Sequence, residues 1–193
     1  MENVEYLKKQ TSILINLYNA KRFEDVISKG KILIKKFPNQ LLFYNATSLS
    51  LSAIGKDEEA LKILARALSQ QNNNIHVLNN LGLINGNLNK NQIAREYFSK
   101  ALLINENFID TLVNLANLNL KENRIQEAKE CLDKAAKSSK IPETDIIIYS
   151  ALGQYYQHVG NFKEAINCFN IVNKLNPENV IADKGISLIH KYK

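Results

Sequence analysis

The alternation of apolar and polar positions between residues 146 and 179 predicts two short amphipathic helices joined by a tight turn. When these 34 residues are numbered as a frame, large apolar residues occupy frame positions 4, 7, 11 and 24 (Tyr149, Leu152, Tyr156 and Phe169). Small residues occupy positions 8, 15 and 20 (Gly153, Gly160 and Ala165). Small residues let antiparallel helices approach closely, Gly160 lets the chain reverse, and Pro177 at position 32 ends the second helix. One such unit cannot bury its apolar face alone, so further copies are expected.

The same frame recurs at four earlier starts, residues 7, 41, 75 and 109, which are each 34 residues apart. The predicted repeats are therefore 7–40, 41–74, 75–108, 109–142 and 146–179. The last start is displaced by three residues, and we attribute this displacement to a slightly longer polar loop over 138–145, around Pro142.

The first two repeats depart from the pattern at its small positions. Thr47 and Ser48 replace the usual Leu-Gly pair in 41–74. In 7–40, Leu14 and Val26 stand where small residues are expected, so the two helices of that repeat are expected to lie further apart. Terminal repeats of an array are often atypical.

The segment 180–193 is predicted to form one further helix without a partner. We expect Ile181, Ile186 and Ile189, supported by Leu188, to cover the open edge of the last repeat. Such a cap keeps the apolar face of a terminal repeat out of water. An alternative is that the array was cut from a longer protein, and the sequence leaves both interpretations open.

The 34-residue pattern resembles the tetratricopeptide repeat (TPR) family, through its spaced large residues, its small residues at positions 8, 15 and 20, and its late proline. The resemblance implies an all-α fold, a right-handed α-α superhelix of five helix-turn-helix repeats with a C-terminal capping helix. It also implies that residues 1–193 form a single domain of the solenoid type.

The charge of the chain changes this picture little. The chain carries 25 Lys and Arg and 19 Asp and Glu, for a net charge of +6, and residues 1–40 hold eight basic and four acidic residues. The lysines of 29–36 are interleaved with Ile32, Leu33 and Ile34, as on a solvated helix face. Nucleic-acid sites usually add aromatic stacking groups or a recognisable motif, so we expect no nucleic acid as a partner.

The sequence favours a location in the cytoplasm. No segment approaches 18 uninterrupted apolar residues, and the N-terminus has acidic residues where a signal peptide has basic ones. Membrane insertion is therefore not expected. Cys131 and Cys168 are far apart and both fall at frame position 23, which favours buried packing positions in a reducing compartment over a disulfide.

The sequence contains no recognisable catalytic constellation. His76, His158 and His190 lie in distant units, so they are not expected to converge on a metal. The glycines match no phosphate-loop spacing. We therefore predict a protein that is not an enzyme and that uses no cofactor or metal.

The resemblance implies a concave groove lined by the first helices at frame positions 2, 5, 6, 9, 12 and 13. The candidate groove residues are amide-rich, nearly neutral and moderately apolar: Ile15, Tyr18, Asn45, Leu49, His76, Asn79, Asn80, Leu83, Asn114, Asn117, Gln154, Gln157 and His158. Among the lining positions only Lys8 and Lys121 are basic. The groove therefore lacks the clamp with which TPR co-chaperones hold acidic chaperone tails.

Asn80 and Asn114 share frame position 6 in successive repeats. They resemble the asparagine ladder of the TPR region in O-linked N-acetylglucosamine transferases, where asparagine amides bind the backbone of an extended peptide. If the resemblance holds, both should face water in the free protein. Asparagine is abundant along the whole chain, so composition alone is an alternative explanation.

The sequence thus predicts a non-catalytic protein-protein interaction scaffold that binds a peptide segment or a partner helix in its concave groove. An alternative is the N-terminal, substrate-recruiting module of a larger glycosyl- or sulfotransferase. Self-association through the end faces of the solenoid is a third. The identity of the partner does not follow from the sequence.

Overall fold

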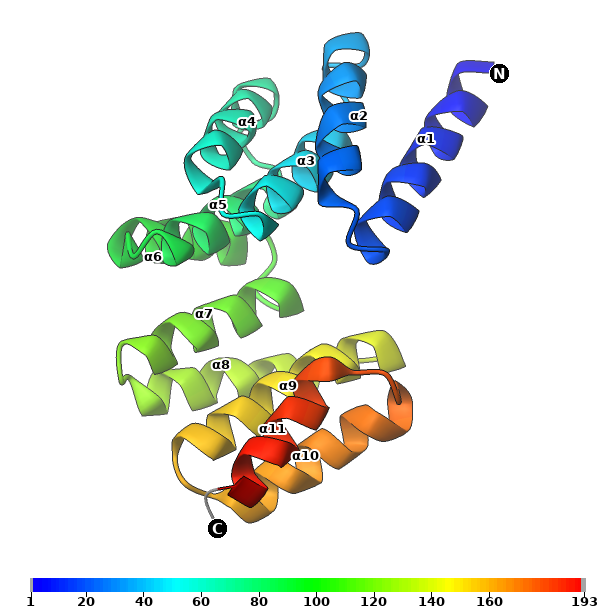
Figure 1. The fold of residues 1–193 in the computed structure, drawn as a ribbon. Helices are drawn as coiled ribbons and strands as arrows, with labels where there is room; N and C mark the ends of the chain where they lie inside the picture. Colours follow the sequence, from blue (N-terminus) through cyan, green and yellow to red (C-terminus); the bar gives the residue numbers. More distant parts are fainter. Residues whose placement is uncertain (1, 192–193) are drawn as a thin grey trace. The chain divides into compact units, whose positions relative to one another are not determined.

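The computed structural model describes residues 2–191, with side chains from residue 4 onward, and these residues form eleven α-helices and no strand (Figure 1). The predicted all-α fold, five helix pairs followed by a single helix, is confirmed. The chain divides into two compact units, which we call unit 1 (residues 1–104) and unit 2 (residues 105–193). Each unit is described separately below.

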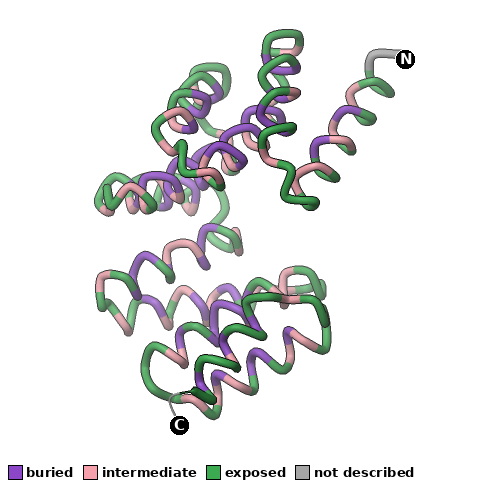
Figure 2. The backbone as a smooth tube through the Cα atoms, in the orientation of Figure 1, coloured by how far each residue is buried: buried purple, intermediate pink, exposed green. Residues whose placement is uncertain are grey.

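Unit 1 contains three antiparallel helix pairs. They are α1 (Glu2–Asn19) with α2 (Phe23–Lys36), α3 (Leu41–Ala53) with α4 (Asp57–Gln70), and α5 (Ile75–Asn87) with α6 (Asn91–Ile104). The middle first helix, α3, packs against both α1 and α5, so the first helices lie side by side. Many of the buried residues of this unit lie on α3 and α5 (Figure 2).

Unit 2 contains two helix pairs and the final helix. They are α7 (Ile109–Lys121) with α8 (Ile125–Ser138), α9 (Pro142–His158) with α10 (Phe162–Leu175), and α11 (Val180–Lys191). Here α9 packs against both α7 and α11, and α10 packs against α9 and α11. The C-terminal core consists of Ala165, Phe169, Val172, Ala182 and Ile189.

The chain reverses at frame position 15 in each of the five predicted repeats. The residues there are the ones with a left-handed backbone: Lys21, Gly55, Asn89, Asn123 and Gly160, with φ between 56° and 76°. Glycine adopts this conformation at little cost, and asparagine tolerates it better than most side chains do. The same local geometry thus occurs even in the first repeat, where the sequence pattern is weakest.

In the third and fifth repeats the glycine at frame position 8 lies against the aromatic ring at position 24. A Cβ built on Gly153 would overlap the ring of Phe169, and one built on Gly82 would overlap the ring of Phe98. Phe169 also lies against Gly185 of α11, so its ring is enclosed between two glycines from different helices. Both rings are almost completely buried.

In the first two repeats, the residues that replace the usual ones are either hydrogen-bonded or buried. The Thr47 hydroxyl donates to the Phe43 carbonyl at 2.7 Å, and the Ser48 hydroxyl donates to the Asn45 carbonyl at 3.0 Å. Leu14 and Val26 are completely buried, and α1 diverges from α2 in Figure 1.

The prediction of a longer loop before residue 146 is wrong. Only residues 139–141 separate α8 from α9, and the additional residues lengthen α9 to 17 residues, against 13 in α3, α5 and α7. Pro142 begins the helix because its fixed φ and missing N–H suit a first helical position. The Ser139 hydroxyl supports this first turn by donating to Asp145 at 2.6 Å.

The prediction for the capping residues is half wrong. Ile189 is buried and Ile186 packs against the same core, as expected. Ile181 and Leu188 are instead 48% and 47% exposed. Seven residues separate them, which places both on one face of α11, whereas Ala182, Gly185 and Ile189 form the buried face. Residues 192 and 193 of the predicted helix lie outside the described residues.

Candidate functional site

Five predicted groove residues line one groove of about 370 Å³ on the first helices of unit 1. They come from three helices: Ile15 and Tyr18 from α1, Asn45 and Leu49 from α3, and His76 from α5. We call this surface the unit 1 groove. Its remaining lining residues are Leu14, Asn19, Leu41, Leu42, Ala46 and Asn74.

The unit 1 groove combines exposed apolar side chains with uncharged polar groups. Ile15 is 48% and Leu42 is 41% exposed, so both offer apolar contact area to a ligand. Burial raises the pKa of the Tyr18 phenol above its ordinary value, at which the hydroxyl is already neutral at physiological pH. Among the described residues that line the groove, none is Lys, Arg, Asp or Glu. The groove therefore suits an apolar, uncharged ligand segment.

The asparagines behind this groove form a short chain of hydrogen bonds. Asn80 Nδ2 donates to Asn45 Oδ1 at 3.1 Å, and Asn79 Nδ2 approaches Asn80 Oδ1 at 3.5 Å. Asn79 and Asn80 are each only 6% exposed. The expectation that Asn80 faces water is therefore wrong, because the packing of α5 against α3 turns this amide toward Asn45.

Within this chain of bonds, Asn45 keeps an amide donor at the unit 1 groove. Asn45 accepts from Asn80 through Oδ1, and among the described residues its Nδ2 donates to no protein atom. Asn45 is partly buried and lines the groove, so this amide group is reachable by a ligand. A peptide carbonyl is a matching acceptor for such a donor.

The other predicted residues fall in different surroundings. Leu83 is partly buried and lies outside the lining of the unit 1 groove. In unit 2, Asn117 and Gln154 line a hollow of about 340 Å³ together with Ser150. Gln154 and Gln157 line a second hollow, of about 690 Å³, between α9 and α11.

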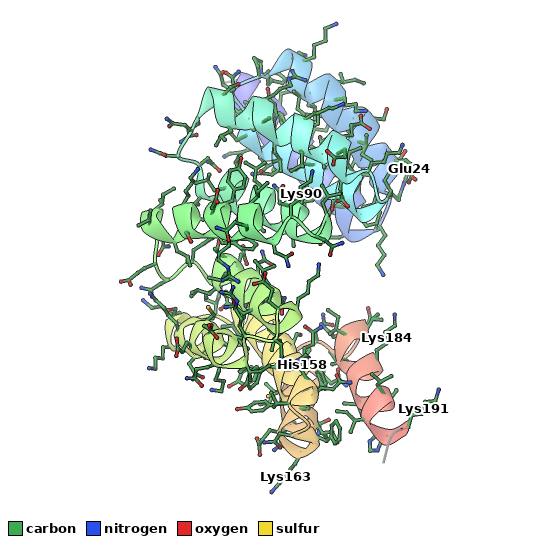
Figure 3. All side chains as sticks on the ribbon, turned by 90° about the vertical axis from the view of Figure 1, so that its left-hand side faces the viewer. Glu24, Lys90, His158, Lys163, Lys184 and Lys191 are labelled. Atoms are coloured by element: carbon green, nitrogen blue, oxygen red, sulfur yellow. The ribbon has the colours of Figure 1, made fainter. Side chains whose placement is uncertain are left out.

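Two predicted residues of unit 2 lie outside both hollows. Asn114 is partly buried, and His158 is exposed at the end of α9 (Figure 3). Asn80 and Asn114 belong to different units, so the ladder remains a prediction.

Several lining residues were not predicted, although the 34-residue frame identifies their positions. Leu42 falls at frame position 2 of its repeat and was not assigned to the groove. If the frame is continued from residue 180, Ile181, Lys184, Leu188 and Lys191 fall at positions 2, 5, 9 and 12. All four line the larger hollow of unit 2, although the sequence pattern assigned them to a cap or to no site.

The described residues offer no evident metal site or membrane span. Within residues 2–191, no three His, Cys, Asp or Glu side chains lie close enough together to hold a metal ion. None of the helices in that range is both long and apolar enough to cross a membrane.

A family model described as tetratricopeptide repeat matches residues 75–108, 109–141 and 146–179, which together make up more than half of the chain. These ranges agree with the last three predicted repeats to within one residue. A comparison with curated proteins found no match.

Similarity to solved structures extends over nearly the whole chain at low sequence identity. A thermophilic TPR protein from Thermus thermophilus matches with a TM-score of 0.82 at 14% identity, covering 95% of this chain and 98% of that one. The Cut9–Hcn1 hetero-tetramer of the APC/C matches with a TM-score of 0.80 at 14% identity. That match covers 95% of this chain, which spans only 36% of the matched chain. PilW, a widely conserved type IV pilus biogenesis factor, matches with a TM-score of 0.69 at 15% identity, covering 96% of this chain and 90% of that one.

Proposed function

We propose, for a chain that belongs to the tetratricopeptide repeat family, that it acts as a non-catalytic protein-interaction scaffold. Its ligand is an uncharged peptide segment or partner helix that lies in the unit 1 groove. Apolar side chains of the ligand contact Ile15 and Leu42, and a ligand carbonyl accepts from Asn45 Nδ2.

The observation that carries this proposal is the state of Asn45. Its oxygen is held by Asn80 at 3.1 Å, so the orientation of the amide is fixed before any ligand arrives. A donor that is already oriented loses little freedom on binding, which favours affinity. The exposed apolar residues around it supply the contact area that a single hydrogen bond lacks.

The solved structures support a role in assembly only through their fold. The Cut9–Hcn1 structure is a hetero-tetramer of the APC/C, and PilW is a pilus biogenesis factor. We extend to this chain the general idea of a helical-repeat surface that holds another protein, and none of those specific partners.

A partner capture experiment with matched variants tests the proposal. Tagged wild type, an Ile15→Asp/Leu42→Asp groove variant and an Ile32→Asp control are incubated with native lysate, and bound proteins are quantified by mass spectrometry. Ile32 is 66% exposed on α2, away from the groove, so the control adds a charge without touching the lining. Thermal melts establish that all three chains fold.

The groove variant should lose its specific partners by about tenfold or more, because each buried carboxylate removes apolar contact and must be desolvated. The control should keep them. Equal capture by the groove variant and the wild type would exclude the unit 1 groove as the binding surface.

A second candidate is that the chain is the N-terminal recruiting module of a larger glycosyl- or sulfotransferase. In the Cut9–Hcn1 match this chain spans 36% of the matched chain, so a similar array can be part of a longer protein. The shared frame position of Asn80 and Asn114 is the sequence feature on which this candidate rests. Sequencing the gene beyond Lys193 tests it, and a stop codon there would exclude it.

We also propose that the chain works in the cytoplasm. Within the described residues the two cysteines form no disulfide with each other. Burial raises the pKa of the Cys168 thiol to about 11, so that this group stays protonated and packs as an apolar side chain. Imaging of a tagged full-length chain tests the location, and a signal confined to another compartment would contradict it.

A further inference from the structure

One side of α11 is polar at frame positions where α5 carries buried, nonpolar residues. The frame continued from residue 180 places Asp183 and Ser187 at positions 4 and 8, and both are exposed. The same positions hold Leu78 and Gly82 in α5, where they are buried. This side of α11 therefore does not offer the apolar surface on which a second helix packs in the other pairs.

Two of the exposed apolar residues of α11 lie on a different side, toward α9. Ile181 and Leu188 line the hollow of about 690 Å³ between α9 and α11, which we call the α9/α11 hollow. Gln154 and Gln157 of α9 line it as well. Its lining thus combines two exposed apolar side chains with amide groups, which can bind the backbone of a ligand.

The charged side chains of this hollow are mainly basic. Lys184 and Lys191 line it, one near the start of α11 and the other at its end (Figure 3). Among the described residues neither lysine has an ion-pair partner, whereas Lys90 and Lys134 each contact a glutamate. Of the described residues that line the hollow, Asp183 alone is acidic, and one of its oxygens accepts from Asn173 Nδ2 of α10 at 2.9 Å, so the two lysines leave the lining with a net positive charge.

We propose that the α9/α11 hollow binds an acidic amphipathic segment of another protein. Large apolar side chains of the segment contact Ile181 and Leu188, and its carboxylates pair with Lys184 and Lys191. Ile181 and Leu188 are seven residues apart on α11, and so are Lys184 and Lys191. The two residues of each set therefore lie about 10.5 Å apart along the helix axis. The ligand should present its apolar and its acidic groups at a similar spacing. This site is separate from the unit 1 groove and does not depend on the function proposed for it.

A protein segment fits this surface better than an anionic membrane does. A membrane would be contacted by apolar and basic residues that project from a convex face. Here the apolar residues instead line a hollow together with Gln154 and Gln157, whose amides suit the backbone of a peptide.

Selection from a random twelve-residue peptide library tests the proposal without a known ligand. The full chain is compared with Lys184→Glu/Lys191→Glu and with a control of equal charge change, Lys163→Glu/Lys174→Glu. The control lysines are exposed on α10 and do not line the hollow. The wild type and the control should enrich peptides with at least two Asp or Glu and two large apolar residues. The hollow variant should lose this class by at least tenfold.

Two further measurements keep the result specific. The best acidic peptide should bind Leu188→Ser at least fivefold more weakly in fluorescence anisotropy, and its affinity should fall with added salt because exposed charges are screened. The Ile15→Asp/Leu42→Asp variant should bind it as the wild type does, which separates this site from the unit 1 groove.

Three outcomes would overturn the proposal. The first is that the wild type enriches no acidic amphipathic class relative to Lys184→Glu/Lys191→Glu, and the second is that the α10 control loses that class equally. The third is binding of phosphatidylserine vesicles that depends on Lys184 and Lys191 while no peptide class is enriched, which would indicate a lipid surface instead.

Discussion

At the scale of single residues, the left-handed residue at frame position 15 sets how each second helix starts. Lys21 occupies this position in the first repeat with φ of 56°, where the second and fifth repeats have glycine. A side chain with a Cβ is strained there by about 1–2 kcal/mol. Replacing Lys21 with glycine would remove this strain. It would also stabilise the unfolded chain, because glycine has more conformational freedom there, and this second effect cancels part of the gain.

Lys21→Gly should therefore raise the free energy of unfolding by about 0.5–1 kcal/mol. Urea denaturation monitored by circular dichroism measures it. The matched control is Lys29→Gly, inside α2, which should lower stability by about 1 kcal/mol because glycine is a poor helix former. If Lys21→Gly were as destabilising as the control, the strain at Lys21 would be absent.

A second prediction at this scale concerns Asn80, whose amide joins Asn45 and Asn79. Asn80→Ala removes these contacts and takes away the donor that the partly buried Asn45 Oδ1 accepts from. Stability should fall by about 0.5–1.5 kcal/mol, the usual net contribution of such a hydrogen bond. Asn117→Ala, at an exposed position on α7, should change it by less than about 0.5 kcal/mol. Chemical denaturation measures the free energy of unfolding of both variants. An Asn80→Ala variant as stable as the wild type would show that these amide hydrogen bonds contribute nothing to stability.

At the scale of elements, the contact between a glycine and an aromatic ring determines how closely paired helices approach. Phe169 is enclosed by Gly153 of α9 and Gly185 of α11, so its ring has little room to move when a methyl group is added. Gly153→Ala should destabilise unit 2 by about 1–3 kcal/mol through overpacking.

Gly86→Ala is the control for this prediction. A Cβ at Gly86 would lie 3.9 Å from the Cβ of Ala94, an ordinary contact, and the change should be neutral or stabilising by up to about 1 kcal/mol through helix propensity. Thermal melts measure both variants. Equal effects would show that propensity, and not the ring, dominates at Gly153.

The repeat period was predictable from the sequence because it depends on local requirements that recur every 34 residues. The Gly160 turn and the Gly153–Phe169 contact each need a particular residue size or backbone freedom, and such needs are visible in the sequence. The extension of α9 was not predictable from the sequence, because Pro142 is compatible both with a loop and with the first turn of a helix.

The site was predictable only in part, for a similar reason. Frame position indicates which residues share one side of a first helix, and Ile15, Asn45 and His76, which were named from it, line one groove. It does not tell whether a neighbouring helix covers that side. Asn80 is buried and bonded to Asn45, whereas Ile181 remains exposed on α11. Both facts depend on tertiary packing.

At the scale of the whole molecule, a solenoid distributes its stability along the chain, because each repeat contacts only its neighbours. Ala165 is completely buried in α10, so Ala165→Leu should overpack the last pair and cost about 1–3 kcal/mol. Amide hydrogen exchange should then increase in 146–191 before it increases in 41–108. A uniform loss of protection along the chain would instead indicate one cooperative unit.

The central claim is that the unit 1 groove, on the first helices of unit 1, binds a peptide. The most direct measurement is a nuclear magnetic resonance titration of the isotope-labelled full chain with a peptide taken from a captured partner. We predict that the largest shifts fall in α1, in α3 and at the start of α5, and that the Asn45 side-chain amide shifts with them. If the largest shifts fell in α2, α4 and α6 while the Asn45 amide stayed unchanged, the ligand would bind the outer helices and the claim would be wrong.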